Sequence, residues 1–274
     1  MMNKDDKVIE GFGEEWNSYK YDEAEKEKTY ESFQQYFSIF PWDRISETSE
    51  GFDMGCGSGR WAQFVAPKVG RLNCVEPSKA FDVAKANLGS LGNVMFLQET
   101  TDTCSLPSES QDFGYCLGVL HHIPDTEAAL KDCARLLKPG APFLLYLYYS
   151  FENKPWWFKA IWKVSDIFRR GISALSYRPR KLVCETIATV IYLPLARSAW
   201  LMERLGLDVG NMPLSDYRTK PFYQMRNDAL DRFGTRLEQR FSRAQILRML
   251  ENSGLGDVKF SDETPYWCCI SYKR

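Results

Sequence analysis

The chain has 274 residues, of which 44% are hydrophobic and 26% charged, the composition of an ordinary globular protein with one large α/β domain or a domain plus an inserted subdomain. Its net charge of −1 provides no basic field, so we do not expect nucleic acid as a partner. Eight cysteines are scattered without a C-x-x-C pair and only two histidines accompany them, which predicts buried thiols in a reducing cytosol and no metal site.

Residues 1–50 are predicted to form an N-terminal helical cover. They are charged and helical in pattern and carry aromatic residues along their length, until Pro41 breaks the pattern. The first residues lack the apolar core of a signal peptide, so we expect a cytoplasmic protein.

From residue 51 to residue 150, short apolar runs alternate with helical patterns. The predicted strands are 51–54, 72–76, 94–97, 113–118 and 143–149, and the helices between them are 61–65, 78–88 and 126–137. Alternating strands and helices predict a parallel sheet with helices on both faces.

Residues 151–235 interrupt this alternation and are predicted to form an inserted helical lid that contributes to substrate binding. Tryptophans and basic residues fill 156–181, a pattern that fits peripheral contact with a membrane surface. A stripe of core residues explains the same pattern more simply and is the favoured interpretation. The apolar run 182–196 is shorter than the ~20 residues that a spanning helix needs, so we do not expect it to cross a membrane.

Residues 236–274 are predicted to complete the core domain. Ser242 and Gln245 form a capping-box pattern that opens a helix ending near Gly254. Two further strands follow, around 258–260 and 266–272.

The main candidate site is a glycine-rich turn between the first strand and the first helix of the core. Gly55, Gly57 and Gly59 allow a tight turn and a close approach of the backbone to a ligand. The helix start that follows offers free N–H groups to polar ligand atoms. The pattern alone fits nicotinamide and flavin dinucleotides as well as adenosyl cofactors.

Two acids and one glycine follow the next strands. Glu76 ends the second strand, where its carboxylate can accept hydrogen bonds from both ribose hydroxyls of an adenosine. The alternative interpretation is a surface glutamate at a strand end. Asp102 follows the third strand and is placed to accept from an adenine amino group, whereas the alternative is an ordinary turn residue. Gly118 ends the fourth strand. Strand ends of this kind meet where open α/β sheets bind ligands.

At this point the chain resembles the class I S-adenosylmethionine-dependent methyltransferases. The resemblance rests on DMGCGSGR, VEPS, the segment around Asp102, LGVLHHIPD and ARLLKPGAPFLLYLYY. The third glycine of the loop follows two residues after the second, which favours S-adenosylmethionine over a nicotinamide cofactor. Residues 12–19 also resemble a leader that covers the cofactor pocket in a subset of small-molecule methyltransferases.

The resemblance implies a Rossmann-like, seven-stranded, mostly parallel sheet whose last strand is antiparallel. It also implies a set of cofactor contacts. Those at the carboxyl-amino end are Asp53, Gly55, Cys56, Gly57 and Gly59; those at the ribose and adenine are Glu76, Pro77, Asp102 and Thr103; those along the methionine chain are Gly118 and Val119.

No single catalytic residue follows from the resemblance. We expect both histidines at the rim of the pocket, His121 as a base or orienting group and His122 either as a substrate contact or simply bonded to a backbone group. Tyr19 is a second catalytic candidate, with packing as its alternative. The predicted substrate contacts are Trp16, His122, Tyr148, Arg218, Tyr223 and Arg226. For the two arginines the alternative is a surface ion pair with Asp216, Asp228 or Asp231.

The sequence therefore predicts a methyltransferase that acts on a small-molecule metabolite or biosynthetic intermediate. Two alternatives stay open. One is an enzyme that uses S-adenosylmethionine for cyclisation or transfer of another group, and the other is a non-catalytic protein that binds S-adenosylmethionine.

Overall fold

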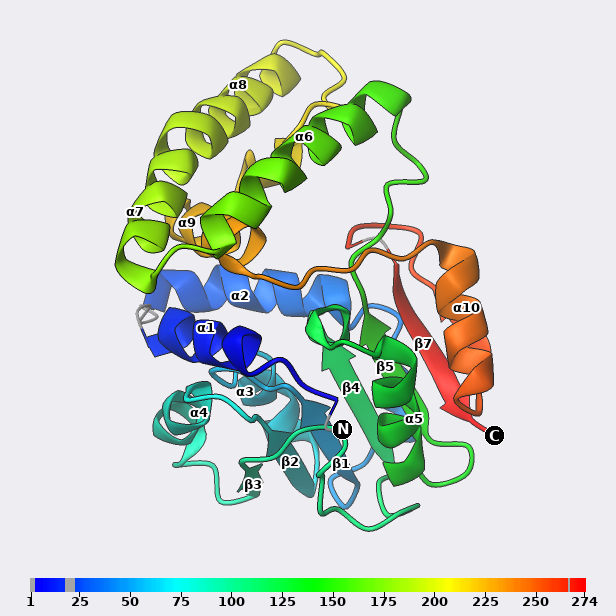
Figure 1. The fold of residues 1–274 in the computed structure, drawn as a ribbon. Helices are drawn as coiled ribbons and strands as arrows, with labels where there is room; N and C mark the ends of the chain where they lie inside the picture. The colour runs from blue at the N-terminus through cyan, green and yellow to red at the C-terminus, as the bar shows by residue number, and fades with distance from the viewer. Residues whose placement is uncertain (1–2, 18–22, 266) are drawn as a thin grey trace. The chain divides into compact units, whose positions relative to one another are not determined.

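The central strands are buried on both faces, and this is why they appear in the sequence as nearly continuous apolar runs. The computed structural model describes residues 3–17, 23–265 and 267–274, which include a seven-stranded sheet in the order β3-β2-β1-β4-β5-β7-β6 (Figure 1). The strands are β1 (Glu50–Met54), β2 (Arg71–Val75), β3 (Val94–Leu97), β4 (Phe113–Leu117), β5 (Pro142–Tyr146), β6 (Leu255–Phe260) and β7 (Cys268–Lys273). The first five pair in parallel and β7 is antiparallel to both of its neighbours, which confirms the predicted fold.

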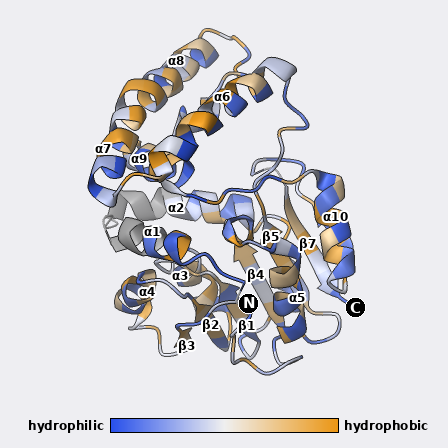
Figure 2. Cartoon of the chain, in the orientation of Figure 1, coloured by the Kyte–Doolittle hydropathy of each residue, from blue (hydrophilic) through white to orange (hydrophobic). Residues whose placement is uncertain are grey.

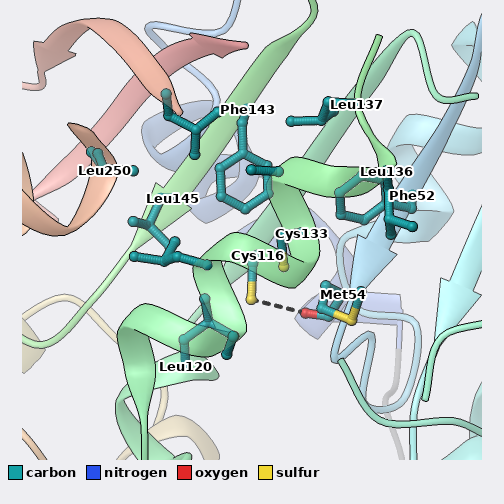
Figure 3. Close-up of a cluster of buried hydrophobic side chains, with 14 of the residues drawn as sticks. Phe52, Met54, Cys116, Leu120, Cys133, Leu136, Leu137, Phe143, Leu145 and Leu250 are labelled. Carbon is teal, nitrogen blue, oxygen red and sulfur yellow. Dashed lines mark hydrogen bonds between the residues drawn. The ribbon is translucent and has the colours of Figure 1, made fainter. Parts of the chain in front are cut away.

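Helices cover both faces of the sheet because alternate strand residues point to opposite sides. On one face, α5 (Thr126–Leu136) and α10 (Arg243–Asn252) share a hydrophobic cluster with Phe52, Cys116 and Phe143 (Figure 3). The Cys116 thiol in this cluster donates a hydrogen bond to the Met54 carbonyl at 3.1 Å. The other face packs against α3 (Ala62–Val65) and α4 (Ala80–Leu88). All eight cysteines are buried and free, as predicted.

The segment before the first strand packs onto this core. It consists of α1 (Asp6–Asn17), α2 (Glu23–Tyr36) and a 3₁₀ turn, η1 (Trp42–Arg44). Phe33 and Phe37 are buried in the cluster that includes α3 and α4, and α1 lies against α4. Trp16 lies within α1, whereas Tyr19 lies outside the described residues.

The chain divides into two compact units. The described residues up to 150 and from 237 onward form the core unit, and residues 151–236 form the helical unit. The helical unit contains α6 (Trp156–Ser173), α7 (Tyr177–Ile187), a π-helical turn (Ala188–Tyr192), α8 (Leu193–Arg204), the 3₁₀ turn η5 (Ser215–Tyr217) and α9 (Phe222–Gly234). It has a hydrophobic cluster of its own, centred on α7, α8 and α9.

Helices α7 and α8 and the π-helical turn form one continuous helix, Tyr177–Arg204, of 28 residues. Among the described residues it is the one helix whose length and composition would allow it to cross a membrane. The apolar run at 182–196 thus belongs to a helix that extends beyond both of its ends. The helix continues through Pro194 because the π-helical turn directly before it relaxes the hydrogen bonding that proline disrupts.

The cap of α10 has the predicted form. Ser242 Oγ accepts a hydrogen bond from Gln245 N at 3.1 Å, and Gln245 Oε1 accepts one from Ser242 N at 2.8 Å. These two bonds satisfy backbone donors that a helix start otherwise leaves unpaired.

We expect Ser242→Ala to lower the free energy of unfolding by about 1 kcal/mol, because an N-cap hydroxyl is lost. Ser242→Asp keeps an acceptor at the cap and should retain most of the stability. Urea denaturation of both variants measures the difference. Equal losses for the two substitutions would show that the cap hydrogen bond is not what stabilises α10.

Candidate active site

The glycine-rich turn reverses the chain directly after β1. Gly55 N and Cys56 N both donate to Val75 O on the neighbouring strand, at 2.8 and 3.1 Å. Gly55 and Gly59 have φ angles of +76° and +81°, which side chains other than glycine rarely tolerate. A Cβ at Gly55 would lie 2.6 Å from Val119, so the turn and the loop after β4 are in direct contact.

Glu76 is fixed against this turn. Its Oε2 accepts a hydrogen bond from Gly57 N and its Oε1 accepts one from Ser78 N, both at 2.9 Å. The side chain is only 7% exposed. Glu76 directly follows the end of β2, and Pro77 lies between it and Ser78. The carboxylate is therefore held by two backbone donors at the carboxyl end of the sheet, where its remaining lone pairs can accept from hydroxyl groups.

Asp102 and Thr103 lie in the loop after β3, and this loop is tied to the N-terminal segment. Asp102 Oδ2 accepts a hydrogen bond from Asn3 N at 2.9 Å. The hydroxyl of Thr100 donates to the other oxygen, and this bond lowers the pKa of Asp102, aided by the Asn3 bond and opposed by burial. Asp102 is therefore an ionised acceptor at the sheet edge.

Asn3 also reaches the loop before α5. Its Nδ2 donates to Asp125 O at 2.7 Å, while its Oδ1 accepts from Asp125 N at 2.9 Å. Asn3 thus joins the loops that follow β3 and β4. Sequence reasoning missed this residue, since an asparagine near a chain terminus carries no pattern of its own.

Gly118 and Val119 follow β4. Gly118 has a φ of +80° and its N–H donates to Tyr146 O at 3.1 Å. A Cβ there would meet nothing closer than 4.0 Å, so the positive φ rather than crowding requires glycine. The structure therefore brings the predicted cofactor contacts of β1, β2 and β4 to one edge of the core unit.

Asp53 lies behind the turn, inside β1, and is 2% exposed. Burial raises its pKa to about 8; the Tyr115 hydroxyl opposes the shift and the charge of Glu76 adds to it. Oδ2 of Asp53 has no hydrogen-bond partner among the described residues. A buried oxygen of this kind, next to a turn that a side chain would obstruct, fits the ammonium and carboxyl end of S-adenosylmethionine.

The two histidines form the 3₁₀ turn η3 (Leu120–His122), and both are buried. The expectation that they lie at the rim of the pocket is wrong, because residues 237–241 run across them. Gln239 N donates to the His121 carbonyl at 3.0 Å, and His122 Nδ1 lies 2.7 Å from the Leu237 carbonyl. The backbone alternative predicted for His122 is therefore observed.

His121 is fully buried, and its ring stacks on Tyr148 with a centroid distance of 3.8 Å. Neither ring nitrogen has a hydrogen-bond partner among the described residues. Burial lowers the pKa of His121 well below its ordinary value, and the charges of His122 and Arg240 act in the same direction. The ring is therefore neutral at physiological pH, the form that accepts a proton.

Arg240 is a second residue that the sequence did not point to. Its guanidinium lies 4.9 Å from the centroid of the Tyr148 ring, and its Nε is paired with Glu238 at 2.8 Å. Nothing in the local sequence distinguishes it from the other arginines of the chain. Its place beside Tyr148 follows only from the pairing of residues 237–241 with the strand end after β5.

The predicted substrate residues of the helical unit are engaged within that unit. Arg218 pairs with Glu203 at 2.8 Å and Arg226 with Glu185 at 2.5 Å, and neither glutamate is among the partners expected from the sequence. The partners differ because α7 and α8 bring these glutamates close from distant positions in the chain. Tyr223 packs against the cluster of α7, α8 and α9. Roles toward a substrate stay predictions for all three. Among the described residues, no group of three His, Cys, Asp or Glu could hold a metal.

We expect Glu76→Ala to weaken S-adenosylmethionine binding about ten- to a hundredfold, because hydrogen bonds to a charged group contribute roughly 1.5–3 kcal/mol. The loss combines the predicted ribose contacts with the two observed bonds to Gly57 N and Ser78 N. Calorimetry measures it, with the exposed Glu47→Ala as the matched control. Equal affinity for wild type and Glu76→Ala would remove Glu76 from the site.

Asp53 should make the stability of the cofactor-free protein depend on pH. Its folded-state pKa of about 8 lies above the unfolded value, so its stabilising contribution is lost as pH rises toward 8. Asp53→Asn removes this titration. We expect the free energy of unfolding of wild type to fall relative to the variant, by up to about 1.4 kcal/mol per pH unit between pH 6 and 8. Urea denaturation curves that shift in parallel for both proteins would contradict this.

Comparison with known proteins agrees with this geometry. The family model described as a methyltransferase domain matches residues 52–145. The chain is 33% identical over 104 residues to an uncharacterized methyltransferase of Bacillus subtilis, YcgJ, a match that covers 37% of this chain and 41% of that protein. It is 28% identical over 105 residues to the ubiquinone biosynthesis O-methyltransferase of Serratia proteamaculans, covering 37% and 42%. The chain thus spans less than half the length of these curated relatives.

A solved structure shows the same fold over nearly the whole chain. It is a chain of the complex between the Haloferax volcanii Trm112 methyltransferase activator and a putative methyltransferase, with a TM-score of 0.54 and 13% identity, covering 95% of this chain and 96% of that one. The family match, the sheet order and the glycine turn backed by Glu76 lead to one assignment. Residues 52–145 of the core unit are a methyltransferase domain of the class I type, and the cofactor that this match supports is S-adenosylmethionine.

Proposed function

We propose that the chain is an S-adenosylmethionine-dependent methyltransferase that acts on a small-molecule metabolite or biosynthetic intermediate. The observation that carries this proposal is the edge formed by the turn at Gly55–Gly59, Glu76 and the Asp102 loop. These parts come from three adjacent parallel strands, and each offers the kind of group that one part of the cofactor requires.

When bound, S-adenosylmethionine supplies an electrophilic methyl group on its sulfonium. The residues of the chain then have binding and orienting roles. Glu76 accepts from the ribose and Asp102 from the adenine, while Asp53 and the turn hold the amino-acid end. A rigid turn favours transfer because alignment of the reacting groups supplies a large part of the rate.

The acceptor is proposed to be a small molecule on the basis of the relatives. Several of them are ubiquinone biosynthesis O-methyltransferases, and the biosynthesis of ubiquinone concerns a small molecule. The helical unit is proposed to take part in acceptor binding, since it leaves the core unit after Ser150, two residues beyond Tyr148. The cytoplasm is the proposed compartment, and the eight free cysteines support it.

His121 is proposed to act as a general base or to orient the acceptor. Support comes from its two ring nitrogens, which have no hydrogen-bond partner among the described residues, and from its ring stacked on Tyr148. Its burial means that residues 237–241 must leave room for the acceptor before His121 can touch it. Trp16, Tyr148 and His122 remain the candidates for acceptor contact within the core unit.

The test begins with calorimetric titration of the protein with S-adenosylmethionine and S-adenosylhomocysteine, with NAD as the control ligand. We expect the first two to bind and NAD not to bind. Candidate acceptors are then screened by release of S-adenosylhomocysteine. Binding of NAD alone would overturn the cofactor assignment. Turnover that yields no S-adenosylhomocysteine would instead indicate another chemistry of the same cofactor, and binding without turnover of any acceptor would indicate a non-catalytic protein.

His121→Phe separates binding from catalysis. It keeps a ring against Tyr148 but removes both ring nitrogens. We expect turnover to fall about a hundredfold, the usual range for a lost general base, with S-adenosylmethionine affinity unchanged. Turnover equal to that of wild type would exclude His121 from the reaction.

A further inference from the structure

Helix α6 is amphipathic, but its charged side chains lie on the buried side and its large apolar side chains on the exposed side. Its two buried residues are Asp166 and Arg169, both charged. Its large exposed side chains are apolar: Trp156, Ile161, Val164, Ile167 and Phe168, with exposed fractions from 52% to 80%. A helix of a soluble unit normally turns its apolar stripe inward and its charges outward. The apolar face of α6 therefore requires an explanation outside the helical unit.

The orientation of α6 is fixed by the charges that it buries. Arg169 Nε pairs with Asp166 Oδ1 at 2.6 Å, and Arg169 Nη1 donates to the carbonyls of Thr235 and Arg236, both at 2.9 Å. Arg232 lies 3.8 Å from the same carboxylate. Burial raises the pKa of Asp166, but the hydrogen bond from Arg169 and the neighbouring arginines outweigh it and lower the pKa. Rotating α6 to bury its apolar face would expose this network and break it.

The exposed face of α6 is continuous and has a basic edge. Val164 lies three residues after Ile161, three before Ile167 and four before Phe168, and Trp156 lies about three turns before Ile167. The exposed apolar residues therefore share one face along the helix. Lys159, Lys163 and Arg170 line one side of it, also at helical spacing. An apolar stripe with a basic border is the pattern of a helix that lies in a membrane interface.

The neighbouring long helix extends the apolar surface. Its inner side packs Cys184, Ala188, Tyr192 and Ala196 against α9. On its outer side Leu182, Val190 and Leu201 are more than half exposed. Of 14 large hydrophobic residues exposed among the described side chains, 12 lie between residues 156 and 207, and Figure 2 shows hydrophobic colour along α6, α7 and α8.

The two units also differ in net charge. Residues 151–236 contain 15 lysines and arginines and 8 aspartates and glutamates, a net charge of +7. The rest of the chain contains 20 basic and 28 acidic residues, a net charge of −8. The unit with the exposed apolar side chains is thus also the basic one. This combination is complementary to an anionic bilayer, whose headgroups attract basic side chains while its interior accepts apolar ones.

We propose that the helical unit docks on the surface of an anionic phospholipid bilayer, with the apolar face of α6 in the interface and its basic edge at the headgroups. The docking is peripheral, since the long helix keeps one side packed on α9. It requires neither cofactor nor acceptor, so it stands or fails independently of the proposed methyl transfer.

The test is flotation of the full-length protein with vesicles of phosphatidylcholine, alone or mixed with phosphatidylglycerol. We expect binding to the mixed vesicles, weaker binding to phosphatidylcholine alone, and release by high salt because exposed charges are screened. Equal binding to both compositions would overturn recognition of the anionic surface. Resistance to extraction by alkaline carbonate would overturn peripheral docking in favour of a spanning helix.

Substitutions in α6 test whether this helix forms the surface that binds the vesicles. Ile167 is 71% exposed, so Ile167→Glu leaves the packing of the unit intact and should weaken binding about tenfold or more. Met95→Glu places the same charge on an exposed apolar residue of β3 and should bind as wild type does. Lys163→Glu should weaken binding to the mixed vesicles, with Lys259→Glu in β6 as its control. Wild-type binding by Ile167→Glu would overturn the proposal.

Light scattering tests whether the apolar face of α6 binds a second copy of the chain instead of a bilayer. A wild-type dimer that becomes monomeric in Ile167→Glu, together with no flotation of wild type, would assign the face to self-association and overturn membrane docking. Far-UV circular dichroism and thermal unfolding of each variant confirm that it is folded before its binding is compared.

Discussion

The carbonyl of Val75 accepts two hydrogen bonds from the turn after β1, and the geometry of the whole cofactor edge follows from that pairing. It forces the backbone to reverse over residues 55–59, with positive φ angles at Gly55 and Gly59 that favour glycine. The reversal directs Gly57 N toward Glu76 and seats the turn against Val119. Asp53, fixed one strand residue before the turn begins, is consequently buried without a full set of partners. The core unit carries this unfavourable carboxyl at the place where a positively charged ligand would relieve it.

Local patterns were sufficient to predict the sheet and most of the cofactor edge. Strands such as β5 are apolar without interruption because both of their faces are covered, and the segments between them have helical spacing. The glycine turn could be recognised because its conformation excludes other residues. The cap of α10 depends on residues three positions apart, so its signal is local as well.

Features that depend on distant contacts escaped prediction. The histidines are buried by residues 237–241, which are more than a hundred positions away along the chain. No local sequence pattern predicts the contact between these two segments. The partners of Arg218 and Arg226 come from other helices for the same reason. The sequence of α6 predicts an amphipathic helix, but not which side faces inward. That choice was decided by Asp166 and Arg169, whose partners lie at residues 232–236.

The contacts of Asn3 have a consequence for the order of assembly during synthesis. Its partners lie 99 and 122 residues further along the chain, so they are synthesised well after it. The link between the loops after β3 and β4 is therefore complete only after the strand and loop of residues 113–125 have been made. Contacts of such high sequence separation form late and contribute to slow folding. The segment around Asn3 is thus a late-docking element of the core unit, and it acts on the loops after β3 and β4 rather than on the sheet.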